Sequence, residues 1–246
     1  MWTMLAVFCA EFIGTALLTF GGIGSAMTTG MTVDGTKKTI DVLTVSAAFG
    51  VSVALAVATV GAHANPAVTI GLGINGLNRL SPWLIPVYFA GQFAGGILGV
   101  YCLRWGVPGK FAGSIGVHAL NPDITYLQCI FLECILSAVL VFSIVTMERH
   151  PRNRGVHPLT TAPVAGCVVF IAHVILIRLT GGSINPARSV AAAVVGADYH
   201  HLWIFCVGPF LGGLIGGFVG MGIVRIEKHI CCGDGTMPID NPIQIM

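Results

Sequence analysis

The chain consists largely of apolar runs long enough to cross a lipid bilayer. Runs of this length cover about residues 4–27, 40–60, 83–103, 124–147, 159–179 and 202–224. Only 9% of the residues are charged and the mean hydropathy is +0.87, whereas about a quarter of the residues in a soluble domain are charged. A backbone in lipid must satisfy its hydrogen bonds internally, so these runs predict helices. We therefore predict an all-α, multi-pass integral membrane protein with six transmembrane helices.

Two copies of one triplet interrupt this pattern, Asn65-Pro66-Ala67 and Asn185-Pro186-Ala187. Asn is a favoured helix N-cap and Pro is favoured at the first helical position, so each triplet predicts a helix start. The apolar pieces that follow, 68–74 and 187–195, are too short to cross and predict half-helices. Helix starts at membrane depth are tolerated where they face protein or a water-filled cavity. A matched pair in corresponding halves therefore indicates a transport path.

An internal repeat relates the two halves. Glu11-x-x-x-Thr15 matches Glu133-x-x-x-Ser137, and the pattern Gly-x-Phe-x-Gly-Gly-x-x-Gly occurs at 91–99 and again at 208–216. Each half holds an odd number of full crossings, so the halves must insert with opposite topology. We expect a single channel domain over 1–246, with repeat halves at about 1–117 and 118–230. A short C-terminal tail, 231–246, would follow the last crossing, whose apolar run ends at 224.

Other functional classes find little support in the sequence. The net charge is +2 with no basic stripe, so no nucleic-acid partner is expected. No cysteine spacing resembles a zinc site, and no nucleophile–base pair or phosphate loop stands out, so we expect no metal, no cofactor and no enzyme activity. Cys231-Cys232 could be palmitoylated or unmodified. Basic residues at 149–154 and after 224 favour cytoplasmic termini, in either the plasma membrane or an internal membrane.

Four segments carry a family resemblance. They are Glu11-Phe12-Ile13-Gly14-Thr15, Ala48-Phe49-Gly50, and the stretches 61–69 and 181–189 that contain the triplets. With them the chain resembles the aquaporin, or major intrinsic protein, family over nearly its whole length. The resemblance implies six helices and two half-helices that meet head to head. It also implies a homotetramer in the lipid bilayer with one water pore in each protomer.

The resemblance also implies the pore residues. Asn65 and Asn185 would turn amides toward the lumen, while His63 would line the path. The half-helix dipoles and Arg188 would repel cations and protons, as is known for aquaporin-type pores. The selectivity filter would comprise Phe49, His173, Gly182 and Arg188, with His173 and Arg188 as hydrogen-bond donors. Between Phe49 and Asn65 the chain is about four residues shorter than is usual in the family, so Val45 is an alternative to Phe49.

Two acidic residues are expected inside the membrane. Glu11 and Glu133 occupy repeat-related positions in apolar runs. They could form part of a proton relay, or they could accept backbone N–H groups from the loops that precede the half-helices. A relay needs further titratable partners and none is evident, so we expect the two carboxylates to brace the loops.

Several functions remain open at this stage. Aquaglyceroporins usually carry Asp and a basic residue where this chain has Ser189 and Ala193, which favours a passive water channel that excludes ions and protons. A channel for a slightly larger neutral solute, such as glycerol, ammonia or hydrogen peroxide, is the alternative, because Gly182 leaves the filter open. An ion-coupled transporter and a structural junction protein are further alternatives.

Overall fold

The computed structural model describes residues 2–29, 39, 41–74, 81–112, 115–149 and 158–232, and every regular element in these ranges is a helix. The basic loop at 150–154 and the tail beyond 232 lie outside the described residues. The side chains of Cys231 and Cys232 do so as well.

The longer helices form two sets of four. They are α1 (Trp2–Thr29), α2 (Val42–Val60), α3 (Pro66–Gly73) and α4 (Ile85–Gly106), then α6 (Tyr126–Arg149), α7 (Thr161–Leu176), α8 (Pro186–Gly196) and α9 (Ile204–Cys232). Short elements join them: the 3-10 turns η1 (Pro82–Leu84) and η3 (Pro158–Thr160), and the one-turn helix α5 (Gly109–Ala112).

The predicted fold class is confirmed. Five helices, α1, α2, α4, α6 and α9, are long and apolar enough to cross a membrane. The sixth crossing is α7, which is apolar but has only 16 helical residues. It is extended at one end by η3 and at the other by the turn at 177–180. The half-helices α3 and α8 have 8 and 11 residues, too few to cross.

The last helix extends beyond the apolar run of the last crossing. The apolar run stops at 224, but α9 continues to Cys232. The segment 225–232 holds no Gly or Pro that would stop a helix, and it contains good helix formers such as Arg225, Glu227 and Lys228. Composition therefore indicates where the chain leaves the apolar layer, and not where the helix stops.

Glycines let pairs of helices approach until their backbones touch. A Cβ on Gly95 of α4 would lie 2.0 Å from the Phe12 carbonyl oxygen of α1. The repeat-related Gly212 of α9 would meet the Cys134 oxygen of α6 at 2.1 Å. Because real Cβ atoms do not approach this closely, only glycine fits, and the two glycine rows form the packing seams that the repeat predicts.

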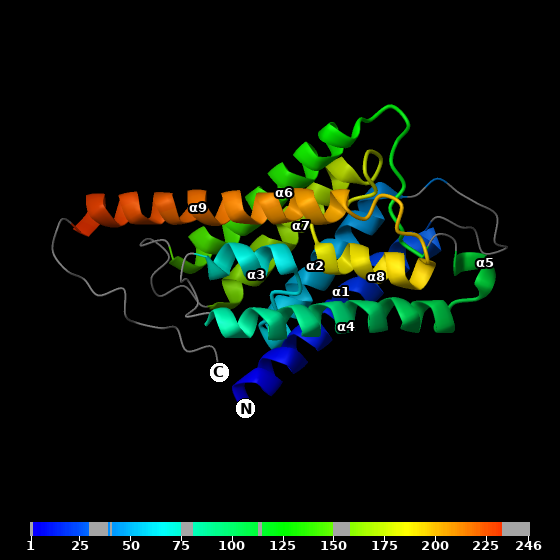
Figure 1. The fold of residues 1–246 in the computed structure, drawn as a ribbon, viewed down its shortest axis with the longest axis horizontal. Coiled ribbons are helices and arrows are strands. Elements are labelled where there is room, and N and C mark those ends of the chain that lie inside the picture. Colours follow the sequence, from blue (N-terminus) through cyan, green and yellow to red (C-terminus); the bar gives the residue numbers. More distant parts are fainter. Residues whose placement is uncertain are drawn as a thin grey trace.

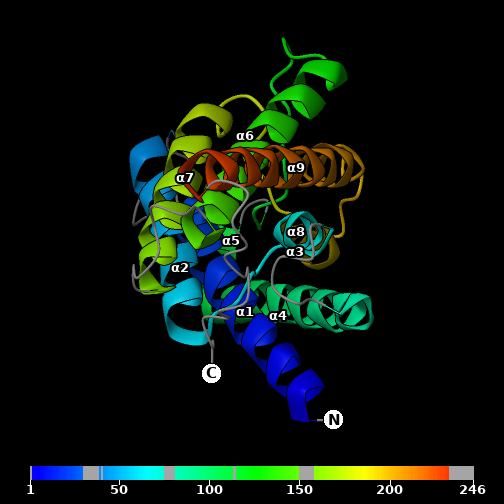
Figure 2. The same ribbon diagram turned by 90° about the vertical axis from the view of Figure 1, so that its left-hand side faces the viewer.

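The half-helices occupy the centre of the bundle. In both views α3 and α8 lie end to end along one line, with α4 on one side and α9 on the other (Figure 1 and Figure 2). The first turn of each half-helix is buried. The helix starts therefore meet inside protein, as an irregular backbone at membrane depth requires.

Candidate functional site

Each Asn-Pro-Ala triplet begins a half-helix. The Oδ1 atom of Asn65 accepts a hydrogen bond from the Ala67 N–H at 2.9 Å, and Pro66 takes the first position of α3. Asn185 does the same at α8, where its Oδ1 accepts from the N–H groups of Ala187 at 2.9 Å and Arg188 at 3.3 Å. Both amides thus fix the helix starts by capping.

The same two amides also join the halves. The Nδ2 group of Asn65 donates to the Ile184 carbonyl at 2.8 Å, and that of Asn185 donates to the Ala64 carbonyl at 2.7 Å. Ala64 and Ile184 both have φ of 49°, a left-handed conformation that is uncommon for these residue types. Each NH2 group has two hydrogens, so one N–H per amide stays available for a permeating molecule.

Two buried carboxylates hold the loops that lead to the triplets. Glu11 accepts from the backbone N–H groups of His63 at 2.7 Å and Ala64 at 2.8 Å. Glu133 accepts from those of Ser183 at 3.1 Å and Ile184 at 2.7 Å. Each carboxylate pairs with the backbone of its own half, which is the bracing geometry expected from the sequence.

The third donor to each carboxylate differs between the halves. Glu11 receives the Gln92 side-chain amide from α4 at 2.8 Å. Glu133 instead receives the Thr180 hydroxyl at 2.7 Å, from the loop itself. Each carboxylate thus accepts three hydrogen bonds, but the third donor comes from a different part of the chain in each half.

His63 lies beside the start of α3. Its Nδ1 atom is 3.1 Å from the Thr69 hydroxyl, and its ring stacks on Tyr88 with centroids 4.6 Å apart. Thr69 also receives Gln92 at 2.8 Å. These contacts fix the ring of a half-buried histidine, and no hydrogen bond to its Nε2 atom comes from the residues that the structure describes.

The four residues assigned to the filter come together from four parts of the chain. Phe49 of α2 and His173 of α7 stack with centroids 4.1 Å apart, and the Arg188 guanidinium carbon of α8 lies 5.4 Å from the Phe49 centroid. A Cβ on Gly182 would lie 3.2 Å from the His173 ring. Phe49 thus makes the aromatic contacts with His173 and Arg188. Val45, one turn earlier on α2, lies in the same buried hydrophobic core as Phe49 but makes no such ring contact among the described residues.

The hydrogen bonding of His173 favours another role than the donor role expected from the sequence. Its Nδ1 atom lies 2.9 Å from the Val169 carbonyl oxygen. A carbonyl only accepts, so Nδ1 carries the proton and Nε2 of the neutral ring is an acceptor. That Nε2 atom and the Nε–H of Arg188 are both buried without a partner among the described residues. The cluster therefore offers an acceptor and a donor, where the sequence predicted two donors.

Arg188 has an anchor that the sequence did not reveal. Its Nη1 group donates to the Gly116 carbonyl at 2.5 Å and to Nε2 of His118 at 2.9 Å. The His118 ring stacks on Phe205 with centroids 3.8 Å apart, and the Ser189 hydroxyl lies 2.8 Å from the same Nε2. His118 sits in the loop before α6, where no spacing in the sequence marks it.

The loop histidine stays neutral. Burial lowers the pKa of His118 well below its usual range, and the charge of Arg188 lowers it further. Arg188 can only donate, so Nε2 of His118 must hold a lone pair to accept from it. A neutral His118 therefore fits the bond observed.

The buried polar side chains of the described residues do not form a metal site. Within the described ranges, no three His, Cys, Asp or Glu side chains come together as metal ligands. Buried polar side chains instead occur at the starts of the half-helices, among them Asn65, Asn185 and Arg188.

The chain is similar in sequence to one family of known proteins over most of its length. The model of the major intrinsic protein family matches residues 1–220. Aquaporin TIP2-2 of Zea mays is 32% identical over 223 residues, covering 88% of this chain and 86% of the relative. Aquaporin-2 of Homo sapiens is 34% identical over 215 residues, covering 86% of this chain and 75% of the relative.

A solved structure shares the fold. The X-ray structure of the aquaglyceroporin from Plasmodium falciparum superposes with a TM-score of 0.81 at 24% sequence identity. The match covers 91% of this chain and 98% of the other. At this identity the likeness establishes the fold alone.

Proposed function

Since the chain belongs to the major intrinsic protein family, whose members are passive channels and not enzymes, we propose that it conducts water and excludes ions, protons and glycerol. The observation that carries the proposal is the cluster of Phe49, His173 and Arg188. A water molecule that enters it exchanges bulk hydrogen bonds for the Arg188 donor and the His173 acceptor. The CH groups of a carbon chain would face the Phe49 ring and could not use either the Arg188 donor or the His173 acceptor.

Charge exclusion rests on the half-helices. The N-termini of α3 and α8 meet at the triplets, and each carries a partial positive charge of about +0.5. Arg188 adds a full positive charge close by. Cations therefore meet an unfavourable field, as is known for aquaporin-type pores.

A second candidate is a channel for a slightly larger neutral solute, such as glycerol, ammonia or hydrogen peroxide. Two observations favour it. Gly182 adds no side chain to the cluster, and the Gly116 carbonyl and His118 hold one end of the Arg188 guanidinium. Both features would widen the filter on the side away from the stacked rings.

The chain is an integral, multi-pass membrane protein. We propose that it assembles as a homotetramer with a separate pore in each protomer. We also propose that both termini are cytoplasmic. An even number of crossings places them on the same side of the membrane.

Stopped-flow light scattering on proteoliposomes tests the proposal. Vesicles with the wild-type protein should shrink under an impermeant osmolyte much faster than empty vesicles, and glycerol should enter both at the same slow rate. Ile215→Ala, an exposed position on α9, serves as a matched control and should behave as wild type. Water flux no greater than in empty vesicles would overturn the proposal. Rapid glycerol entry would favour the second candidate.

A further inference from the structure

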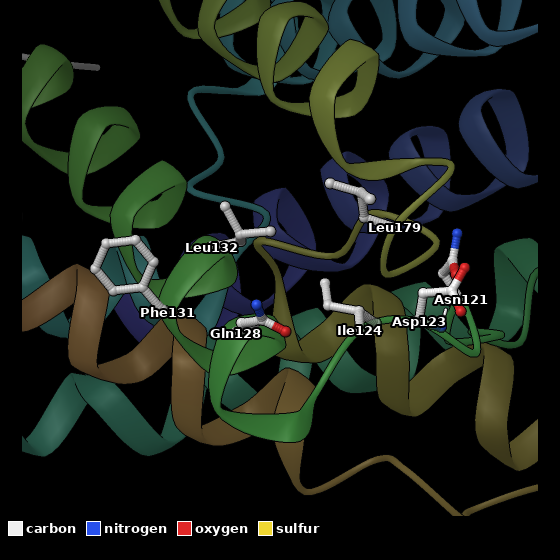
Figure 3. Close-up of a pocket in the computed structure, with 7 residues that line it drawn as sticks. All are labelled: Asn121, Asp123, Ile124, Gln128, Phe131, Leu132 and Leu179. Carbon is white, nitrogen blue, oxygen red and sulfur yellow. Dashed lines mark hydrogen bonds between the residues drawn. The ribbon is translucent and has the colours of Figure 1, made fainter.

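A groove separate from the channel cluster lies where α6 begins and α7 ends (Figure 3). It encloses about 360 Å³. Its lining comes from the loop before α6, from the first two turns of α6, and from Leu179 after α7. None of its lining residues shares a hydrogen bond or a ring contact with Phe49, His173 or Arg188 in the described part of the chain, so the proposed filter does not account for it.

The groove changes from polar to apolar along its length. In Figure 3 the side chains of Asn121 and Asp123 lie together at one end and Phe131 lies at the other, with Gln128 between them. Asn121 and Asp123 precede α6, whereas Phe131 is five residues into the helix, or about 7 Å along its axis. Polarity therefore falls from the helix end toward the middle of the bilayer, as it does along a phospholipid.

The polar end has groups that bind nothing else in the part of the chain described here. The Asp123 carboxylate makes no hydrogen bond there, while the Asp123 N–H donates to Asn121 at 2.9 Å. Gln128 uses its Oε1 atom for the N–H and hydroxyl of Thr125, both at 2.8 Å, so its NH2 group stays available. An exposed Arg178 adjoins the groove through its carbonyl, which accepts from Asn121 at 3.3 Å.

The apolar end continues along the membrane face of α6. Phe131, Ile135 and Val139 follow one another at intervals of four residues and are 60%, 44% and 42% exposed. The close-packing glycine faces of the bundle lie elsewhere, between α6 and α9 and between α2 and α7, where Gly50 and Gly166 meet. The α6 stripe is thus not part of these packing seams within the protomer, and its apolar side chains are exposed.

We propose that this groove binds one phosphatidylethanolamine molecule. Its primary ammonium would donate to Asp123, its phosphate or ester oxygens would accept from the Gln128 amide, and one acyl chain would lie along Phe131. A quaternary ammonium has no N–H to donate to Asp123. A headgroup with net negative charge would be repelled by the Asp123 carboxylate. The groove therefore selects a zwitterionic lipid with a primary amine.

Fluorescence quenching by brominated lipids tests the proposal in reconstituted full-length protein. Phe131→Trp places a reporter at the apolar end, against a background of the four native tryptophans. Ile215→Trp, on the exposed face of α9, is the control. Brominated phosphatidylethanolamine should quench the reporter at 131 more than brominated phosphatidylcholine at equal mole fraction, with a preference of about two- to fivefold, the range of an exposed ion pair. The reporter at 215 should show no preference.

A second substitution identifies the headgroup contact. Asp123→Asn in the Phe131→Trp background should abolish the preference, whereas Asp198→Asn, another exposed carboxylate on a loop at the same end, should keep it. Equal quenching by the two lipids at 131, or a preference that survives Asp123→Asn, would overturn the proposal. Weak quenching by both lipids at 131 would also overturn it, since it would mean that another copy of the chain covers the groove.

Discussion

The rings of Phe49 and His173 stack with their centroids 4.1 Å apart and their planes inclined by 18°. Rings in contact leave no passage between them, so the two residues form one wall of the proposed filter. A permeating molecule would pass beside this wall, close to the Arg188 guanidinium, whose central carbon lies 5.4 Å from the Phe49 centroid. The size limit of the proposed channel therefore depends on how far the two rings extend into the path of the permeating molecule. Of the two rings, His173 is the one that faces Gly182.

Cation exclusion should depend on the neutral amides at the centre. We predict that Asn65→Asp or Asn185→Asp admits cations, because one carboxylate offsets the combined charge of about +1 at the two helix starts. Conductance recordings in planar bilayers measure this. Asn65→Ser is the matched control, since it keeps a capping oxygen and also loses the bond to the Ile184 carbonyl, but adds no charge. Equal conductance in Asp and Ser variants would show that charge is not the barrier.

The buried carboxylates should contribute to stability rather than to flux. Glu133→Gln can direct its remaining oxygen to the two donors that share Oε1, Thr180 and Ser183, leaving one N–H unpaired. Glu133→Ala leaves three donors unpaired. At about 1–3 kcal/mol for each buried unpaired donor, Ala should lower the thermal unfolding midpoint much further than Gln. The same order is expected at Glu11.

The water flux of these variants separates bracing from a relay. Glu11→Gln and Glu133→Gln should retain most of the wild-type osmotic water permeability in proteoliposomes. A Gln variant that unfolds at the wild-type temperature but conducts no water would argue for a direct role of that carboxylate.

A methyl group at position 182 should narrow the filter. We predict that Gly182→Ala slows water, because the added Cβ would lie 3.2 Å from the His173 ring. Gly182 has φ of 69°, so Ala there also costs about 1–2 kcal/mol of stability. Gly181→Ala, with φ of 87°, carries a similar strain and faces His118 instead. Stopped-flow traces that slow equally in both variants would assign the effect to strain and not to obstruction.

Permeability should not respond to the titration of His118. Burial and Arg188 hold its pKa well below 6.5, so the ring stays neutral as the pH falls through the usual range of histidine, and its bond to Arg188 persists. We expect no step from this residue in water flux between pH 8 and pH 5.5. A step in that range that is present in the wild type and absent in His118→Gln would contradict the neutral ring.

Much of the fold and of the central site could be predicted because local chemistry determines them. An Asn followed by Pro caps a helix wherever it stands, and a carboxylate in an apolar run must find donors. The stacking of Phe49 on His173, the tautomer of His173 and the anchor at His118 depend on side chains far apart in the chain. Nothing in the spacing of residues encodes how their rings face one another.

Loops and helix ends were the least predictable parts. His118 lies in a glycine-containing loop and contacts Arg188 and Phe205, which are far away in the sequence. The local sequence of the loop does not encode these contacts. The end of α9 could not be predicted from apolarity, because apolar residues mark contact with lipid and the helix continues beyond them to Cys232.

The paired water and glycerol permeability of wild type and His173→Gly tests the central claim most directly. Both proteins are reconstituted at equal density, with Ile215→Ala as the control and thermal unfolding as the check on folding. We predict fast water and no glycerol flux above empty vesicles for wild type. In His173→Gly, where half of the stacked wall is gone, water should stay fast and glycerol should enter well above the rate of empty vesicles. Wild-type glycerol entry as rapid as that of His173→Gly would show that the stacked pair does not set the size limit.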